Sequence, residues 1–226
     1  MPLSVSLVIP AYNEAECIGP LLAEIAPRLV NQVIVADNGS TDGTGQIAEQ
    51  AGATVVHEPR RGYGYACAAG AAAARGDIVA FMDGDGSFVP AELVKMIDLL
   101  ESGKTELALG SRNFEPMPPG AMPPHQKFGN WLVARLINRI YGTRITDLGP
   151  FRALRRDLLT TLEMHEHTYG WPVEMMVKVA RRKLPMQEVP ITFRPRFAGK
   201  SKVGGTMQGT VLATYRIFRV IFRYSM

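Results

Sequence analysis

Residues 78–87 read IVAFMDGDGS, an apolar run followed directly by two aspartates that alternate with glycines. A short run of this kind, rich in β-branched and aromatic residues, is typical of a buried strand. Asp83 and Asp85 therefore follow a predicted strand, and Gly84 and Gly86 let the backbone turn sharply there. Two carboxylates so close repel each other unless a cation lies between them, and Mg²⁺ or Mn²⁺ prefers such oxygen ligands. A solvated turn is the alternative, and the surrounding segments favour the cation site.

Similar apolar runs recur along the first half of the chain, and helical patterns separate them. The runs cover residues 5–9, 32–36, 54–57, 78–82 and 107–110, and the helical patterns cover residues 14–29, 43–50, 63–75 and 90–101. This alternation predicts βαβ units, and hence an α/β fold with a mostly parallel sheet flanked by helices. Right-handed crossovers place the loops that follow the strands along one edge of such a sheet, which is where ligands bind.

The second half begins with a proline-rich segment, residues 113–125. Its five prolines cannot continue a helix or a central strand, so we predict a loop there. The loop divides a first half, residues 1–112, from a second half, residues 113–204, and we expect residues 205–226 to form a C-terminal amphipathic helix. Within the second half we expect helices at 126–141, 155–162 and 172–182, a loop at 147–150 and a strand at 187–191.

The C-terminal stretch 211–224 is amphipathic at helical spacing. Three arginines share one face, and apolar residues gather on the other: Arg216, Arg219 and Arg223 against Val211, Tyr215, Phe218, Ile221 and Phe222. Such a helix can lie in a membrane interface, pack on the core or contact another subunit, and the sequence leaves all three open. No stretch reaches the roughly 18 apolar residues of a spanning helix, and residues 1–10 lack the basic region of a signal peptide. We expect a cytoplasmic protein, peripheral at the cytoplasmic face of the membrane.

The composition allows several anionic partners. The net charge of +4 and the isoelectric point of about 9.2 fit nucleic acid, phosphorylated substrates or an anionic membrane surface. The basic residues are not interleaved with aromatic residues, as stacking platforms for nucleic acid require, so no nucleic-acid partner is expected. Cys17 and Cys67 have no spacing typical of zinc ligands, and they predict two reduced thiols.

Two further motifs follow predicted strands. Residues 36–43, ADNGSTDG, open a helix; Asp37 could accept a hydrogen bond from a nucleobase, while Asp42 would cap or brace the turn. Residues 9–14, IPAYNE, contain a proline that stiffens the strand exit and Tyr12, whose ring offers a stacking surface. Each motif alone is also compatible with an ordinary loop.

Together, in this order and each at a strand end, the three motifs resemble those of the family-2 glycosyltransferases of the GT-A fold. The similarity covers about residues 5–205. It includes segments that look like dolichyl-phosphate mannose synthase and its polyprenyl-phosphate relatives: residues 110–112, 146–152, 169–174, 188–191 and 196–202. Ser87 stands where relatives often carry Gln, and residues 148–150 read Leu-Gly-Pro where relatives often carry Thr-Ser-Gly.

The resemblance implies a metal-dependent, inverting transfer of a hexose from a nucleoside diphosphate sugar, GDP-mannose or UDP-glucose, to a polyprenyl or dolichyl phosphate. It makes residues 1–112 a nucleotide-binding half and residues 113–204 an acceptor half. It assigns the nucleoside to Pro10, Ala11, Tyr12, Glu14 and Asp37. It assigns Mg²⁺ or Mn²⁺ and the diphosphate to Asp83 and Asp85. The phosphate groups of donor and acceptor would meet Arg112, Arg196 and Lys202, with Gln126 and Lys127 near the acceptor phosphate.

The acceptor decides whether a general base is needed. A lipid monophosphate has a second pKa of about 6, so it is largely ionised at neutral pH and needs no base. A soluble hydroxyl acceptor needs one, and Asp147 and Glu174 are the candidates. A noncatalytic nucleotide-sugar binding module is a third hypothesis, but it has less need of a cation and hence of the two aspartates.

Overall fold

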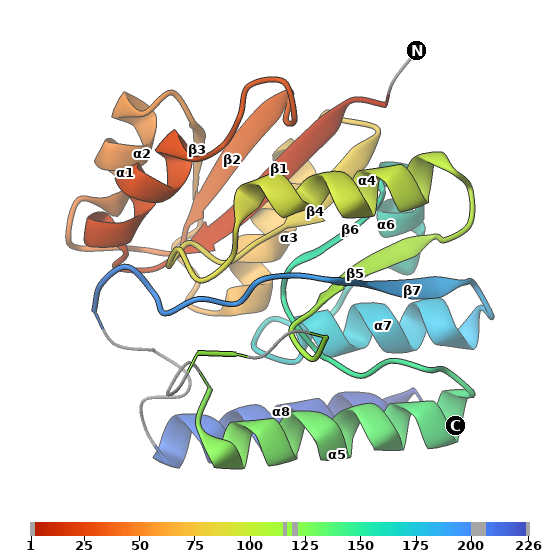
Figure 1. Ribbon diagram of the computed structural model, residues 1–226. Coiled ribbons are helices and arrows are strands. Elements are labelled where there is room, and N and C mark those ends of the chain that lie inside the picture. Colours follow the sequence, from red (N-terminus) through yellow and green to blue (C-terminus); the bar gives the residue numbers. More distant parts are fainter. Residues whose placement is uncertain (1–2, 115–116, 119–121, 200–206, 225–226) are drawn as a thin grey trace.

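A seven-stranded sheet runs through the molecule (Figure 1). The structure is a computed structural model that describes residues 3–114, 117–118, 122–199 and 207–224, the last segment without side chains at 207–214. The strands are β1 (Val5–Ala11), β2 (Gln32–Asp37), β3 (Thr54–His57), β4 (Ile78–Phe81), β5 (Leu107–Ser111), β6 (Arg152–Arg155) and β7 (Met186–Pro190). Their order is β3-β2-β1-β4-β6-β5-β7, and β6 is antiparallel to both of its neighbours. The other pairings are parallel, which confirms the predicted α/β fold.

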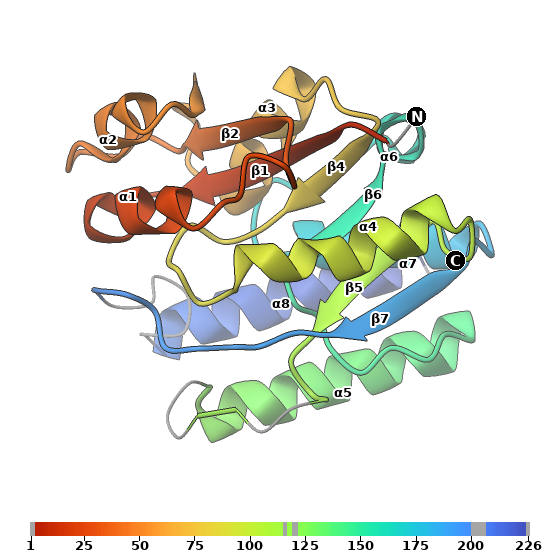
Figure 2. The ribbon, with the colours of Figure 1, turned by 45° about the horizontal axis from the view of Figure 1, so that its top comes forward.

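Helices cover both faces of the sheet. They are α1 (Ala15–Ala23), α2 (Thr44–Gln50), α3 (Tyr63–Ala73), α4 (Leu93–Glu101), α5 (Pro124–Tyr141), α6 (Arg156–Leu162), α7 (Trp171–Arg181) and α8 (Met207–Arg223), with a 3₁₀ turn at Pro90–Glu92. In Figure 2, α1 and α4 lie in front of the sheet, and α3 and α8 lie behind it. Because both faces are covered, the central parallel strands β1 and β4 are buried throughout and almost entirely apolar.

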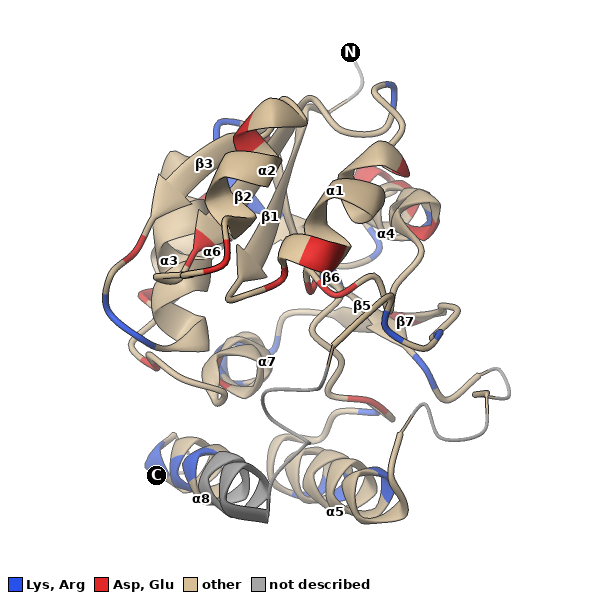
Figure 3. Ribbon diagram, turned by 90° about the vertical axis from the view of Figure 1, so that its left-hand side faces the viewer, with Lys and Arg blue, Asp and Glu red and all other residues tan. Residues whose placement is uncertain are grey.

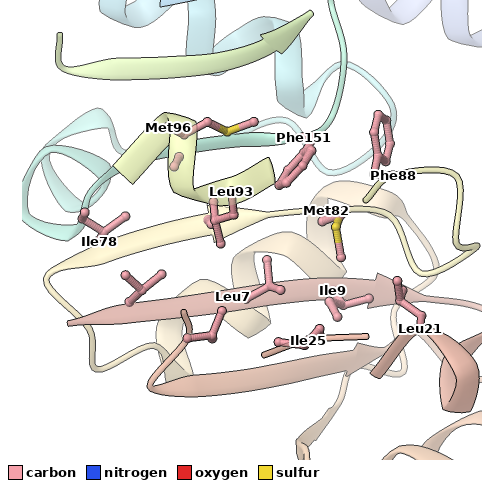
Figure 4. Close-up of a cluster of buried hydrophobic side chains, with 14 of the residues drawn as sticks. Leu7, Ile9, Leu21, Ile25, Ile78, Met82, Phe88, Leu93, Met96 and Phe151 are labelled. Atoms are coloured by element: carbon pink, nitrogen blue, oxygen red, sulfur yellow. The ribbon is translucent and has the colours of Figure 1, made fainter. Parts of the chain in front are cut away.

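Two apolar clusters form the core, one on each face. Leu7 and Ile9 of β1 point into the first cluster with the helices α1, α2 and α4, and Figure 4 shows them with Met82, Leu93 and other members. Val8, the residue between them, points into the second cluster, which includes residues of α3, α6 and α7. This alternation follows from the period of two in a strand.

Helices α5 and α8 form a further layer beneath α7. Figure 3 shows the two helices nearly end-on, side by side and on the far side of α7 from the sheet. Val133 and Ile137 of α5 are buried, as are Val220 and Ile221 of α8. The hydroxyl of Tyr141 donates to the carbonyl of Ile221 at 2.8 Å and joins the two helices. Among the described residues, no helix combines the length and hydropathy needed to cross a bilayer.

The structure corrects several predicted boundaries. Helix α1 ends at Ala23 instead of residue 29, because Pro27 lacks an N–H and disfavours helical geometry at the preceding residue. Helix α5 begins at Pro124 instead of residue 126, since the first helical position tolerates proline. In α8, Tyr215 and Phe222 are exposed while Ile221 is buried, so the expected apolar face of that helix is divided.

Strand β6 was not predicted. Residues 152–155 read RALR and lack an apolar run, and residue 155 was expected to begin a helix. The segment pairs with β4 on one side and β5 on the other, so its extended geometry is stabilised by hydrogen bonds to both neighbours. These pairings insert a strand from the predicted acceptor half into the middle of the sheet.

Candidate functional site

The order of the strands reverses at β1. Strands β2 and β3 lie on one side of it and β4 on the other, so a crevice is expected at the carboxyl ends of β1 and β4. A cavity of about 410 Å³ opens there. It is lined by residues from five loops and helix starts: Pro10, Ala11, Tyr12, Glu14, Asn38, Arg61, Gly62, Tyr63, Ala66, Asp83, Gly84, Asp85 and Tyr169. The structure thus brings together most of the site residues predicted from the three motifs.

Asp83 and Asp85 are held in place by their neighbours. The Tyr63 hydroxyl donates to Asp83 Oδ1 at 3.1 Å, and the backbone N–H and hydroxyl of Ser87 donate to Asp85 Oδ1 at 3.0 and 2.6 Å. Burial, reinforced by the charge of Asp85, raises the pKa of Asp83 to about 7. A divalent cation would relieve this repulsion, and two carboxylates suit Mg²⁺ or Mn²⁺. The residues present therefore fit the expected metal.

Arg196 approaches Asp85 from the segment after β7. Its Nη2 donates to Glu14 Oε2 at 2.7 Å, and its Nη1 lies 3.8 Å from Asp85 Oδ2. The backbone N–H of Phe197 donates to the Asp85 carbonyl at 3.0 Å, so this segment runs directly along the aspartate turn. The prediction for Lys202 concerns a residue outside the described part of the chain.

Arg112 and Asp147 form a buried ion pair. The Asp147 carboxylate accepts hydrogen bonds from the Arg112 backbone N–H at 2.9 Å, from its Nε at 2.8 Å and from its Nη2 at 2.6 Å. Burial by itself would raise the pKa of Asp147, but the Arg112 hydrogen bonds and charge outweigh it, and the pKa is lowered. The charge of Arg112 also acts to lower the pKa of Asp83, although neither Arg112 nor Asp147 is among the residues that line the cavity.

The loop that carries Asp147 is fixed by a second carboxylate. Glu188 of β7 accepts hydrogen bonds from the backbone N–H groups of Thr146 at 2.7 Å and Asp147 at 2.9 Å. Together these contacts set where the Arg112 guanidinium lies.

Glu174 is buried beneath the site. Its carboxylate accepts hydrogen bonds from the backbone N–H of Glu166 at 2.7 Å and from the Tyr224 hydroxyl at 2.6 Å. It also pairs with Lys178 at 2.9 Å. Burial would raise its pKa, but these partners lower it. Glu174 therefore links α7, the preceding loop and the end of α8.

Three other predicted residues take different positions. Asp37 does not line the cavity; its Oδ1 accepts the Ser40 N–H at 2.9 Å, and its Oδ2 lies 3.3 Å from His57 Nδ1. Asp42 braces its turn as expected, since it accepts the backbone N–H groups of Thr44 at 3.1 Å and of Ala15 at 3.0 Å. Lys127 lies on an exposed part of α5 and does not line the cavity.

Several cavity residues were missed in the sequence. The guanidinium carbon of Arg61 lies 3.4 Å from the centre of the Tyr12 ring, and Nη1 donates to the Asn38 carbonyl at 3.0 Å. Arg61 thus covers the ring expected to stack on a base. It follows β3, so the rule that ligands bind at the carboxyl edge would have found it.

Arg152 belongs to the segment 146–152 that resembles the relatives, but no role was predicted for it. It is fully buried, and its Nη1 donates to the Pro172 carbonyl at 2.6 Å. Its Nη2 donates to the carbonyl of Leu148 at 3.2 Å and to that of Gly149. Burial lowers the pKa of Arg152 to about 10. The side chain therefore joins β6 to the loops on either side of it.

Known proteins share this arrangement over nearly the whole chain. Residues 6–162 match the family model described as glycosyl transferase family 2. The chain is 34% identical over 203 residues to a dolichyl-phosphate hexose transferase of Haloferax volcanii, with 88% of this chain and 86% of that protein covered. It is 32% identical over 224 residues to an undecaprenyl-phosphate mannosyltransferase of Micrococcus luteus, with 92% and 90% covered.

A solved structure superimposes on the fold. Glucosyl-3-phosphoglycerate synthase from Mycobacterium tuberculosis, in complex with Mn²⁺, uridine diphosphate and glucosyl-3-phosphoglycerate, gives a TM-score of 0.80 at 25% identity. The comparison covers 99% of this chain and 80% of that one.

Proposed function

The chain belongs to glycosyl transferase family 2, and from that premise we propose that it transfers a hexose, with inversion, from a nucleoside diphosphate sugar to a polyprenyl or dolichyl phosphate. The names of the two relatives support the acceptor class. The complex of the synthase with Mn²⁺ and uridine diphosphate supports a nucleotide donor and a divalent cation. GDP-mannose and UDP-glucose are the donors to test first.

The burial and the partners of Asp147 and Glu174 are the observations that favour a phosphate acceptor over a hydroxyl acceptor. A hydroxyl acceptor must lose a proton to a base in the transition state. Both candidate bases are buried, have a lowered pKa and are occupied by Arg112 or by Lys178 and Tyr224. A phosphate monoester brings its own negative charge, so the site suits an acceptor that arrives ionised.

The proposed mechanism depends on charge. Asp83 and Asp85 would hold Mg²⁺ or Mn²⁺, and a bound cation would offset the negative charge that builds on the leaving diphosphate. Arg112, oriented by Asp147, and Arg196, oriented by Glu14, add fixed positive charge around the phosphate groups. The loop after β1 receives the nucleoside, with Tyr12 as its stacking surface once Arg61 has moved aside.

This function implies a position in the cell. The lipid chain keeps the acceptor phosphate at a bilayer surface, whereas the donor is soluble. We therefore place the enzyme peripherally at the cytoplasmic face of the membrane. Residues 1–112 serve the donor, residues 113–204 the acceptor, and residues 205–226 the contact with the surface.

A second candidate acceptor has its own support. The superposition on the synthase bound to glucosyl-3-phosphoglycerate covers nearly this whole chain, which favours a soluble hydroxyl acceptor that carries a phosphate. The test incubates the protein with radiolabelled GDP-mannose or UDP-glucose, Mn²⁺, a polyprenyl phosphate in detergent and 3-phosphoglycerate. We expect label in the organic extract. Label on the soluble acceptor alone favours the second candidate, and nucleotide binding without any transfer favours a binding module.

A further inference from the structure

Positive charge is concentrated in two stretches of the chain. Residues 116–146 and 189–226 together contain 11 Lys and Arg and no Asp or Glu. The rest of the chain contains 14 Lys and Arg against 21 Asp and Glu. The modest net charge of +4 is therefore the sum of a strongly basic part of the chain and an acidic part. Helix α5 lies within the first stretch and α8 within the second, so the basic stretches meet in the layer beneath α7 (Figure 3).

The same layer carries most of the exposed apolar side chains. Among the described residues, eight large apolar side chains are strongly exposed, and five of these lie on α5 and α8: Phe128, Trp131, Leu132, Tyr215 and Phe222. The Arg135 guanidinium lies 5.8 Å from the centre of the Trp131 ring, so a cation and an exposed aromatic ring lie together on α5. Monomeric soluble proteins rarely gather exposed apolar groups in this way without an interaction partner.

The exposed groups face away from the rest of the molecule. The opposite sides of α5 and α8 are buried with α7 in the second core cluster, through residues such as Ile137 and Ile221. Figures 1 and 2 show the N-terminal ends of α5 and α8 on the same side of the molecule as the carboxyl ends of β1 and β4. A flat partner that covers the layer would therefore extend to the side of the molecule at which β1 and β4 end.

We infer that α5 and α8 together form a docking surface for an anionic lipid bilayer. Charge complementarity identifies the partner: the surface combines Arg and Lys with Trp, Phe and Tyr and has no carboxylate in either helix. This is the composition that binds the headgroup region, where aromatic rings insert and cations meet anionic lipids. The inference deepens the proposed function, on which it rests, because it gives α5 a share of the membrane contact and brings the enzyme to the surface that holds the acceptor.

Trp131 provides a direct assay. The protein has two tryptophans; Trp131 is 53% exposed, whereas Trp171 is 2% exposed in the core. Insertion of Trp131 should shift its emission to the blue on mixing with phosphatidylcholine–phosphatidylglycerol vesicles, and brominated lipid should quench it. Phosphatidylcholine vesicles alone should bind far more weakly. Equal binding to both, or no change in emission, would overturn the inference.

Two double variants, tested by vesicle sedimentation, measure how much the cations and the apolar side chains of α5 each contribute to binding. Arg135→Gln with Arg139→Gln should weaken partitioning about thirtyfold, the combined effect of two cations near an anionic leaflet. Phe128→Ala with Trp131→Ala should weaken it about tenfold or more, because two apolar groups leave the interface. The matched controls are exposed residues on other elements, Arg28→Gln with Arg75→Gln and Val94→Ala, which should bind as the wild type does.

The same variants separate this inference from the proposed function. Transfer to a short-chain polyprenyl phosphate in detergent needs no bilayer, so each variant should retain the wild-type kcat there. If vesicle binding behaves as expected but no lipid is glycosylated, the proposed function fails and the docking surface stands. If the wild type is a dimer in sedimentation velocity and Phe128→Ala with Trp131→Ala makes it monomeric, a second copy covers this surface and the inference is wrong.

Discussion

Asp147→Asn tests two hypotheses for the Arg112–Asp147 pair. In the first, Asp147 is a structural clamp that only orients the Arg112 guanidinium; in the second, Asp147 is a general base. The carboxylate accepts three hydrogen bonds from Arg112, at 2.9, 2.8 and 2.6 Å, and its side chain is 1% exposed. Asn keeps the shape and one oxygen, but it removes the charge and turns an N–H group toward a guanidinium nitrogen. The variant therefore leaves Arg112 with a poor partner while changing the packing very little.

The expected loss of stability follows from burial. Removing one partner of a buried ion pair costs about 3–5 kcal/mol. The Arg112 side chain is 13% exposed, and the Asn oxygen retains at least one hydrogen bond, so we expect the lower end, about 3 kcal/mol. For a domain of this size each kcal/mol lowers Tm by about 2–4 °C, so the melting temperature should fall by about 6–12 °C.

The assay is urea unfolding followed by tryptophan fluorescence, with a matched control. Glu58 accepts the same three hydrogen bonds from Arg60, from the backbone N–H at 2.9 Å, Nε at 2.8 Å and Nη2 at 2.7 Å. The Arg60 side chain is 66% exposed, so solvent already screens this pair. Glu58→Gln should therefore lose much less stability than Asp147→Asn.

Kinetics complete the test. If Asp147 acted as a base, Asp147→Asn would lower kcat by about 10²–10⁴ and abolish an acidic limb of the pH–rate profile. The clamp predicts instead an unchanged shape of that profile and a raised KM for the donor, because Arg112 loses its orientation. A variant as stable as the wild type but without its acidic limb would refute the clamp and support the hydroxyl-acceptor mechanism.

Three further predictions follow from individual contacts. Asp85→Asn should lower kcat about a hundredfold or more at an unchanged unfolding midpoint, and full activity in this variant or in chelator-treated enzyme would disprove the cation site. Arg61→Ala should tighten nucleoside binding about threefold in calorimetry, because a base that stacks on Tyr12 displaces an exposed cation–π contact worth about 0.5–1 kcal/mol; weaker binding would show that Arg61 holds the nucleoside. The Arg60 hydrogen bonds depress the pKa of Glu58 from 4.5 to about 2, so its stabilisation is present above pH 4.5 and disappears as the pH falls toward 2. Acid unfolding of Glu58→Gln should converge with that of the wild type across this window, and a constant difference would contradict the assignment.

Much of the fold was predictable from local pattern. Parallel strands buried on both faces need uninterrupted apolar runs, so residues 5–9, 32–36 and 78–82 marked β1, β2 and β4 within one or two residues. Right-handed crossovers send the loops after such strands to one edge of the sheet, so the order of the motifs along the chain already implied that Tyr12 and Asp83 would meet.

Residues whose role depends on a distant partner were less predictable. Strand β6 has no apolar run and exists because β4 and β5 pair with it on both sides. Arg61 was missed as a cavity residue. Arg152 lies in a segment that resembles the relatives, but its burial was not predicted, since that burial follows from the position of β6.

The sequence by itself determined strands β1, β2 and β4, the edge at which ligands would bind and the aspartate pair, because each of these depends on a periodicity or spacing within a few residues. Only the tertiary structure decided that Asp147 pairs with Arg112, 35 residues away, and that Glu174 is held by Lys178 and Tyr224. It also decided that α5 and α8 share one exposed layer. A carboxylate has the same sequence signature whether it is a base or a clamp, and the difference arises from the charges and the burial that the folded chain places around it.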